Sequence, residues 1–402
     1  MASRRQLLSA TWRIGPKVKF YSNGPLEFGG GGEFTFARIA RTLQKFGYSA
    51  EYIADRKYAG VTNLSHDTAT SLLNGVPYRR EPFISPPPPF FQPFYRRVPD
   101  PRRLSRDAVN LLPIDRLPTP WYLKLLRDRG ILVIFLLHGF SFESMTQTHP
   151  LIAALQAVTR VNLGPFVREF NKGKFFLQVL TGFTWNRFVA AGANPERIFN
   201  IPSGIVVSKY PQPVPTQAFR VLYMGRLERV MKGTSLLFQI AQMLSRLRQE
   251  EVVLTIVGGG PDAERFRRFS PGQRVQYLGF LNESEKLAQI RSSDVLILTS
   301  NMDPYPSVVK EGLVCGLSVL STPCSGPSFM LNLNPEFGKV LQKDSKVFVR
   351  EILDQYEQWK SDPSSYYQLK QKRSESARKL FDSAEEMELY VEMVREASQE
   401  LD

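Results

Sequence analysis

The sequence predicts an α/β protein made of two Rossmann-like domains, and three observations lead to this prediction. Along most of the 402 residues, apolar runs of strand length alternate with amphipathic helical stretches, which is the pattern of βαβ units in parallel sheets. Such a series begins twice, at Lys17 and at Arg220, and a proline-rich linker over Tyr210–Phe219 precedes the second start. The longest apolar run, Ile131–Leu137, has the length of a strand and is far shorter than the ~20 residues of a membrane-spanning helix.

The first predicted domain opens with a strand, a glycine-rich loop, a helix and a second strand. These are Lys17–Tyr21, Gly29–Gly32, Glu33–Phe46 and Ser49–Ala54. The helix has apolar residues at helical spacing, and Gly47 follows it as a stop signal. The dinucleotide-binding fingerprint G-x-G-x-x-G is absent. The glycines therefore either allow the backbone to approach a ligand closely or form a flexible turn.

The segment Pro77–Pro120 contains four consecutive prolines, Pro86–Pro89, among aromatic and basic residues. Proline lacks an N–H and disrupts both helices and central strands, so we expect neither a central strand nor a helix in this segment. It is predicted to be an extended loop. Such a loop could enter a membrane interface, line a binding groove, or pack its aromatic rings on its own domain.

The rest of the first domain is predicted to contain the strands Gly130–Leu137 and Phe175–Leu180, with a last strand and exit loop in Asn194–Gly204. His138 directly follows the first of these strands. Open α/β sheets bind ligands at the carboxyl ends of their strands. His138 is therefore a candidate functional residue, and the alternative is a structural histidine held by hydrogen bonds.

The second predicted domain repeats the alternation. Its strands and helices are predicted at Arg220–Met224, Thr234–Leu247, Val252–Val257, Arg274–Gly279 and Glu283–Ile290. Arg226 and Lys232 lie in the loop between the first strand and the first helix, from which cations can reach the phosphates of a ligand. Taken singly, each would more often be an ordinary surface charge.

Two carboxylates, Asp303 and Glu311, lie eight positions apart between the predicted strands Val295–Thr299 and Leu317–Ser321. Two acids at this spacing are common by chance, but the order strand, loop, helix, strand places this pair at the carboxyl end of a parallel sheet. Ser307 is predicted to cap the intervening helix, whose first free N–H groups, at Ser307, Val308 and Val309, form an anion site. This arrangement favours a ligand that contains a diphosphate, a ribose and a sugar.

The charge is unevenly distributed between the two halves. Residues 1–205 contain 27 Lys and Arg against 13 Asp and Glu, whereas residues 206–402 contain 25 of each, so the first half carries the whole net charge of +14. This excess indicates an anionic partner or an anionic membrane surface, or else a solvated basic face. Nucleic acid would also explain it, but no helix-turn-helix, zinc-finger or RRM signature is present, and we expect no nucleic acid.

Cysteine and histidine are scarce. The two cysteines, Cys315 and Cys324, do not have the spacing of a metal site or of a disulfide scaffold, and there are three histidines. We therefore expect no metal centre and a reducing, cytoplasmic location, with attachment at the inner face of a membrane as an extension of the charge argument.

The ordered series of motifs resembles family 4 of the retaining glycosyltransferases, whose members have the GT-B fold. The resemblance covers nearly the whole chain, strongly in the second half and thinly between about residues 60 and 130. The matching pieces are Gly31-Gly32, His138, Gly225-Arg226-Leu227, Lys232-Gly233, Gly258–Pro261, Tyr277–Phe280 and Asp303 with Glu311-Gly312. The fold it implies has two Rossmann-like domains facing across a cleft, with a C-terminal helix that crosses back to the first domain.

The resemblance also implies roles for single residues. Glu311 would hold the ribose hydroxyls of a nucleotide diphosphate sugar, and Asp303 would face the donor sugar. Arg226 and Lys232 would stabilise the leaving diphosphate, and His138 would lie beside the transferred sugar. The remaining implied contacts are backbone N–H groups at Ser307, Val308 and Val309, further donor-binding positions at Gly258, Gly279 and Phe280, and the cleft-lining glycines Gly31 and Gly32.

These features predict a retaining hexosyltransferase that needs no obligatory metal and no cofactor beyond its nucleotide-sugar donor. Residues 1–209 would bind a glycan or lipid-linked acceptor, residues 210–375 the donor, and residues 376–402 would form the returning helix, with the crossing near Ser374–Phe381. The family has glutamate where this chain has Asp303. A catalytically silent protein that binds a nucleotide sugar or a glycan is therefore the main alternative, and a nucleic-acid-binding protein is the weaker one.

Overall fold

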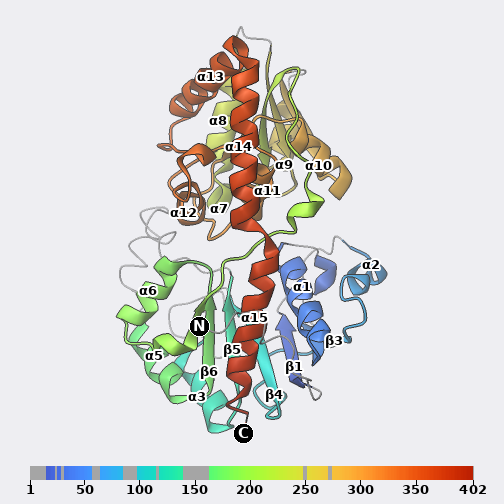
Figure 1. Cartoon of the computed structure of the whole chain (residues 1–402), viewed down its shortest axis with the longest axis vertical. Coiled ribbons are helices and arrows are strands. Elements are labelled where there is room, and N and C mark those ends of the chain that lie inside the picture. The colour runs from blue at the N-terminus through green and yellow to red at the C-terminus, as the bar shows by residue number, and fades with distance from the viewer. Residues whose placement is uncertain are drawn as a thin grey trace. The chain divides into compact units, whose positions relative to one another are not determined.

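The computed structural model describes residues 15–22, 25–28, 31–56, 64–84, 97–114, 117–138, 163–247, 251–269 and 274–401. The chain divides into two compact units (Figure 1). The second unit covers Ser203–Ala384, and the first contains the C-terminal segment from Glu385 onward together with the N-terminal half. The boundaries expected from the sequence are residues 210 and 376.

The first unit is built on a seven-stranded parallel sheet in the order β3-β2-β1-β4-β5-β6-β7. The strands are β1 (Gly15–Ser22), β2 (Tyr48–Asp55), β3 (Tyr78–Glu81), β4 (Ala108–Ile114), β5 (Val133–Leu137), β6 (Phe175–Val179) and β7 (Ile198–Asn200). The order reverses at β1 and β4, so ligand-binding loops are expected at the carboxyl ends of these central strands.

The prediction that residues 77–120 contain no central strand is wrong. Strand β4 lies in the middle of the sheet, between β1 and β5, and β3 forms one edge. Pro113 is tolerated in β4 because the pairing with β1 ends at Leu111, and the proline lies beyond it. The four consecutive prolines of this segment lie outside the described residues.

The helices in the described part of the first unit are α1 (Gly31–Lys45), α2 (His66–Ser71), α3 (Pro120–Asp128), α5 (Leu163–Lys172), α6 (Gly182–Ala190) and α15 (Ser383–Ser398), of which α15 joins this unit from Glu385. One core cluster joins α1, the sheet and α15, and Tyr390, Val391 and Val394 of α15 are buried in it. Figure 1 shows α15 running along the strands of this unit. The expected return of the C-terminal helix to the first domain is thereby confirmed.

The second unit contains a six-stranded parallel sheet in the order β10-β9-β8-β11-β12-β13. The strands are β8 (Phe219–Met224), β9 (Val252–Val257), β10 (Val275–Gly279), β11 (Val295–Leu298), β12 (Ser318–Ser321) and β13 (Gly338–Val340). The prediction of two parallel Rossmann-like sheets is confirmed.

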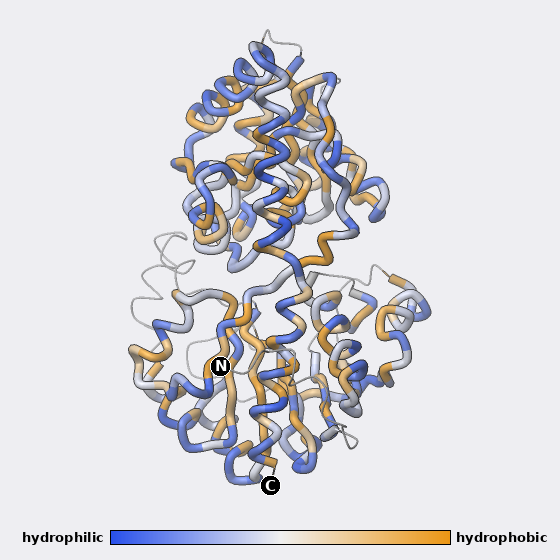
Figure 2. Tube along the Cα trace, viewed as in Figure 1, coloured by the Kyte–Doolittle hydropathy of each residue, from blue (hydrophilic) through white to orange (hydrophobic). Residues whose placement is uncertain are grey.

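Helices cover both faces of the second sheet. They are α7 (Arg229–Lys232), α8 (Thr234–Ser245), α9 (Ala263–Phe269), α10 (Glu283–Arg291), α11 (Ser307–Val314), α12 (Ser325–Leu331), α13 (Ser345–Ser361) and α14 (Pro363–Phe381). One core cluster contains α8 and α13, and the other contains α11, α12 and the end of α14. Figure 2 shows hydrophobic strands inside each unit and hydrophilic residues along the outer faces of the helices. None of the described helices is both long and apolar enough to cross a membrane.

Candidate active site

The predicted acid pair lies where the central strand β11 ends and α11 begins. Asp303 is buried in the connecting loop, and Glu311 lies in the second turn of α11. The prediction that Ser307 caps this helix is wrong, because Ser307 is its first residue and Pro306 is the N-cap, without a side-chain hydrogen bond. An N-cap residue needs no N–H for the helix, so proline fits there. The first N–H groups of α11 consequently have no side-chain cap.

Lys232 and Asp303 form an ion pair, with 2.5 Å between Nζ and Oδ2. Lys232 ends the short helix α7, and Gly233 follows it with φ of +61°. A Cβ atom at Gly233 would lie 2.0 Å from the carbonyl oxygen of Thr299, so only glycine allows this turn to approach the end of β11. The backbone N–H of Asp303 donates to Cys324 Sγ at 3.0 Å. The two predicted residues are therefore brought together by a close backbone contact.

The glycine turns after β8, β9 and β10 pack against one another. Gly258 has φ of +135°, and a Cβ atom there would lie 1.9 Å from the carbonyl oxygen of Gly225. The Gly258 N–H donates to the Gly279 carbonyl at 2.8 Å. Arg226 extends from the first of these turns as an exposed side chain that makes no ion pair with any described residue. Phe280, which follows β10, is 74% exposed.

Glu311 is held by two residues that the sequence did not predict. Its Oε1 atom accepts a hydrogen bond from the Tyr210 hydroxyl at 3.0 Å and lies 3.3 Å from Lys286 Nζ. Lys286 is also paired with Glu283, at 3.0 Å. No described residue donates a hydrogen bond to Oε2 of Glu311. Tyr210 lies 101 positions from Glu311 in a linker, and nothing in the local sequence indicates this contact.

The electrostatic environment keeps both donors protonated. Burial, and then the Glu311 carboxylate, raise the pKa of the Tyr210 hydroxyl. Burial favours the neutral form of Lys286, but Glu311 and Glu283 outweigh it and raise the pKa of its ammonium group. At neutral pH, Oε1 therefore faces one neutral and one charged donor.

The predicted residues of the first unit lie at the carboxyl end of its sheet. His138 follows β5 directly, and its Nε2 lies 3.1 Å from the Tyr390 hydroxyl of α15. Its ring meets the Phe36 ring edge-on at 5.0 Å between centroids. Gly31 and Gly32 form the first turn of α1 and not a loop before it, so the helix begins earlier than predicted. Gly29 and Gly30 lie outside the described residues.

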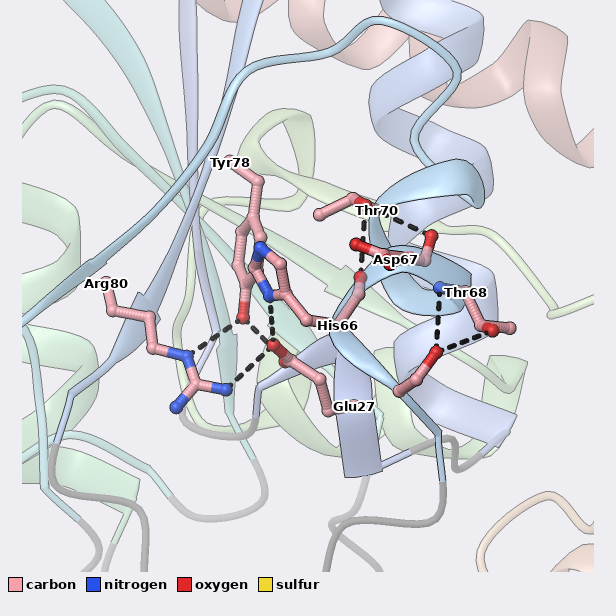
Figure 3. A network of polar contacts seen from close by, with 8 residues as sticks. Glu27, His66, Asp67, Thr68, Thr70, Tyr78 and Arg80 are labelled. Carbon is pink, nitrogen blue, oxygen red and sulfur yellow. Dashed lines mark hydrogen bonds and ion pairs between the residues drawn. The ribbon is translucent and has the colours of Figure 1, made fainter.

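A second unpredicted cluster surrounds Glu27, which lies between β1 and α1 (Figure 3). One carboxylate oxygen is 2.8 Å from His66 Nδ1 and 2.8 Å from an Arg80 guanidinium nitrogen, and the other accepts the Tyr78 hydroxyl at 2.8 Å. Burial favours the protonated acid, but hydrogen bonds from His66, Tyr78 and Arg80, together with a backbone N–H, outweigh it and lower the pKa of Glu27 to about 2. Glu27 thus joins α2 and β3 to the segment that leads into α1.

A groove of about 1050 Å³ lies in the second unit, between residues 208–218 of the linker and α10. Its lining includes Tyr210 but not Asp303, Lys232 or Glu311. The groove is therefore beside the motif residues and not over them. Within the described residues, no three His, Cys, Asp or Glu side chains gather in a way that could hold a metal ion.

Residues 209–379 match the family model described as "Glycosyl transferases group 1". This match covers less than half of the chain. The matched segment contains Arg226, Lys232, Asp303 and Glu311, together with both residues that hold Glu311. The predicted resemblance to a glycosyltransferase is therefore confirmed. No curated protein matches the chain by sequence.

Several solved structures resemble nearly the whole chain. The Anabaena protein HepE in complex with UDP is 16% identical, with a TM-score of 0.65, over 94% of this chain and 100% of that one. Sucrose-phosphate synthase from Thermosynechococcus elongatus is 17% identical, with a TM-score of 0.65, over 95% and 99%. The lipopolysaccharide outer core galactosyltransferase WaaB is 16% identical, with a TM-score of 0.57, over 95% and 98%. At such identities these likenesses show the fold, which is GT-B.

Proposed function

We propose that this protein is a retaining hexosyltransferase that takes its sugar from a nucleotide diphosphate sugar. The observation that carries the proposal is Glu311, a largely buried carboxylate whose Oε2 accepts no hydrogen bond from any described residue. It lies in the second turn of a helix whose first N–H groups have no side-chain cap. A ribose diol bound at Oε2 and a phosphate bound at the helix end would satisfy both groups.

The charges of the second unit fit the chemistry of glycosyl transfer. The bond between the anomeric carbon and the diphosphate oxygen breaks, and its electron pair leaves with the nucleoside diphosphate. The acceptor oxygen forms the new bond to the same carbon, and its proton passes to the departing diphosphate. Lys232, Arg226 and the N-terminus of α11 would stabilise the charge that grows on the diphosphate. Asp303, which is paired with Lys232, would contact the donor sugar.

The first unit supplies the acceptor side of the proposal. The basic residues 1–205 would bind a glycan or a lipid-linked acceptor. His138, which contacts the Tyr390 hydroxyl, would lie beside the transferred sugar. An anionic membrane surface is a further partner that we infer from the charge of residues 1–205. Co-sedimentation with anionic and neutral vesicles at low salt tests the membrane part. The membrane proposal is supported if the protein sediments with anionic vesicles and not with neutral ones. It is contradicted if the protein stays in the supernatant equally with both kinds of vesicle.

The donor proposal is tested by thermal-shift measurements with UDP, GDP, ADP, TDP and their sugars, on the wild type and on Glu311→Ala. The HepE structures contain UDP or UDP-glucose, so the uridine ligands are tested first. A ligand at about 100 times its dissociation constant adds roughly 2.7 kcal/mol to the stability of the native state. Stabilisation by one nucleotide that is lost in Glu311→Ala supports the proposal. No response of the wild type to any of them contradicts it.

Turnover separates the enzyme from a silent binding protein, an alternative favoured by the presence of Asp303 where the family has glutamate. Product formation across a panel of acceptors, in the presence and absence of EDTA, is the measurement. Transfer that persists in EDTA supports a reaction without an obligatory metal. Donor binding without product on any acceptor would support the silent alternative.

A further inference from the structure

We propose that Tyr210 and Lys286 are positioning residues that fix the orientation of the Glu311 carboxylate toward the nucleotide ribose. This inference rests on the proposed donor function. Both contacts are made to the same oxygen, Oε1, at 3.0 Å from the Tyr210 hydroxyl and 3.3 Å from Lys286 Nζ. The carboxylate is planar, so fixing Oε1 leaves Oε2 directed away from these two donors. Oε2 is then the acceptor that remains for a ribose hydroxyl.

The two donors are themselves fixed by neighbouring groups of the second unit. Lys286 is paired with Glu283, one turn away on α10, at 3.0 Å. The carbonyl of Tyr210 accepts from a guanidinium nitrogen of Arg378 on α14, at 2.8 Å, and the Pro211 carbonyl accepts from the same nitrogen at 2.9 Å. The Lys286 ammonium also lies 6.0 Å from the centre of the Tyr210 ring. The pair is therefore a built arrangement and not two mobile surface side chains.

This arrangement connects the donor glutamate to the linker that leads into β8. Tyr210 belongs to the stretch that leads into β8, and Arg378 belongs to the last turn of α14, just before the chain returns to the first unit. Two segments of the second unit thus reach Glu311 through Tyr210. A change in the linker that moved the Tyr210 hydroxyl would remove one of the two donors that hold the carboxylate, and ribose binding would weaken.

Tyr210→Phe tests the inference because it removes only the hydroxyl and keeps the ring in its place beside the core. The loss of a hydrogen bond to a charged group predicts nucleotide binding about tenfold weaker, measured by calorimetry with the nucleotide that the wild type binds. The matched control is Tyr367→Phe. Its hydroxyl donates to the Pro213 carbonyl of the same linker, at 3.2 Å, and its removal leaves both donors to Glu311 in place. We expect wild-type affinity for this control.

Three further measurements distinguish positioning from a general structural effect. In the Glu311→Ala background, Tyr210→Phe should cause no additional loss of affinity, because the hydroxyl then has no carboxylate to orient. The penalty for replacing the nucleotide by its 2′-deoxy form should also be smaller in Tyr210→Phe than in the wild type. Lys286→Met should lower the affinity in the same direction as Tyr210→Phe.

The possible outcomes separate the two proposals. If the wild type binds no nucleotide, the donor function itself is wrong and this inference falls with it. If the wild type binds and Tyr210→Phe binds equally well, the positioning inference alone is overturned. It is also overturned if Tyr367→Phe loses as much affinity as Tyr210→Phe, or if the loss persists undiminished in the Glu311→Ala background.

Discussion

Glu27 in the first unit and Glu311 in the second are two largely buried carboxylates that each receive a tyrosine hydroxyl and a cation, yet they use their oxygens differently. Both oxygens of Glu27 are occupied, by His66 and Arg80 on one side and by Tyr78 on the other. Both donors to Glu311 share Oε1. A carboxylate whose two oxygens both contact donors of its own chain joins structural elements. A carboxylate with one oxygen left without a donor can still accept a hydrogen bond from a ligand. We therefore expect Glu27 to govern stability and Glu311 to govern binding.

The largest expected effect is the loss of stability in Glu27→Ala. This substitution leaves the donors of three side chains without their acceptor, and hydrogen bonds to charged groups contribute about 1.5–3 kcal/mol each. Because His66 and Arg80 are partly exposed and can turn to water, we expect a loss of about 2–3 kcal/mol in the free energy of unfolding. Denaturation followed by circular dichroism, with hydrogen exchange in β2 and β3, measures it.

Glu51→Ala is the matched control for this prediction. Glu51 also carries a carboxylate paired with an arginine of β3, Arg79, but both side chains are more exposed. Exposed ion pairs contribute about 0–1 kcal/mol, so we expect a small change. Equal losses in Glu27→Ala and Glu51→Ala would show that the Glu27 cluster contributes no more to the free energy of unfolding than an exposed ion pair does.

The complementary prediction concerns Glu311→Ala. We expect nucleotide affinity to fall about a hundredfold, because the carboxylate would no longer accept the ribose hydroxyls. The free energy of unfolding should change by less than about 1 kcal/mol, since Lys286 keeps Glu283 as a partner. Binding is measured by calorimetry and stability by denaturation without ligand. A large loss of stability with unchanged nucleotide affinity would show that Glu311, like Glu27, governs stability and not binding.

The dependence of stability on pH is the third test. The pKa of Glu27 is about 2 in the folded protein, below its ordinary value of 4.5, so its contribution is present above pH 4.5. It is lost as the pH falls from 4.5 toward 2, because in this interval the carboxylate of the unfolded chain binds a proton while that of the native state stays ionised. We expect the stability of the wild type to fall roughly 2 kcal/mol further than that of Glu27→Gln across this interval. Parallel curves for the two proteins would contradict the lowered pKa.

The sequence predicts the elements of the second unit well, because the residues of its motifs lie in short consecutive stretches of strand, loop and helix. The loop with Asp303 and the helix with Glu311 follow one strand within a single stretch, and the parallel sheet brings Lys232 beside Asp303. The position of the helix start was wrong by one residue, since Pro306 and not Ser307 occupies the N-cap. Composition misled the prediction for β4, where a proline-rich neighbourhood surrounds a buried central strand.

Neither carboxylate cluster could be predicted in full. The cluster around Glu27 joins residues from three elements, and Tyr78 lies 51 positions away from Glu27. The Tyr210 contact spans 101 positions. Such contacts depend on the register of strands and on the path of a linker, neither of which leaves a periodic or compositional trace. A motif therefore predicts a candidate binding residue, but not the residues that contact it.

The smallest expected effect compares the two tyrosines directly. Tyr78→Phe removes the only described side-chain donor to one oxygen of Glu27 and should cost about 1 kcal/mol of stability, because that partly buried acceptor then lacks a partner. Tyr210→Phe removes one of two donors to Oε1 of Glu311, and Lys286 remains, so its stability should stay within about 0.5 kcal/mol of the wild type. Denaturation of both variants in the absence of nucleotide measures the difference. If Tyr210→Phe proved the more destabilising, Tyr210 would serve chiefly to anchor the linker. The free Oε2 acceptor of Glu311 would then no longer be a reason to regard this carboxylate as binding and that of Glu27 as structural.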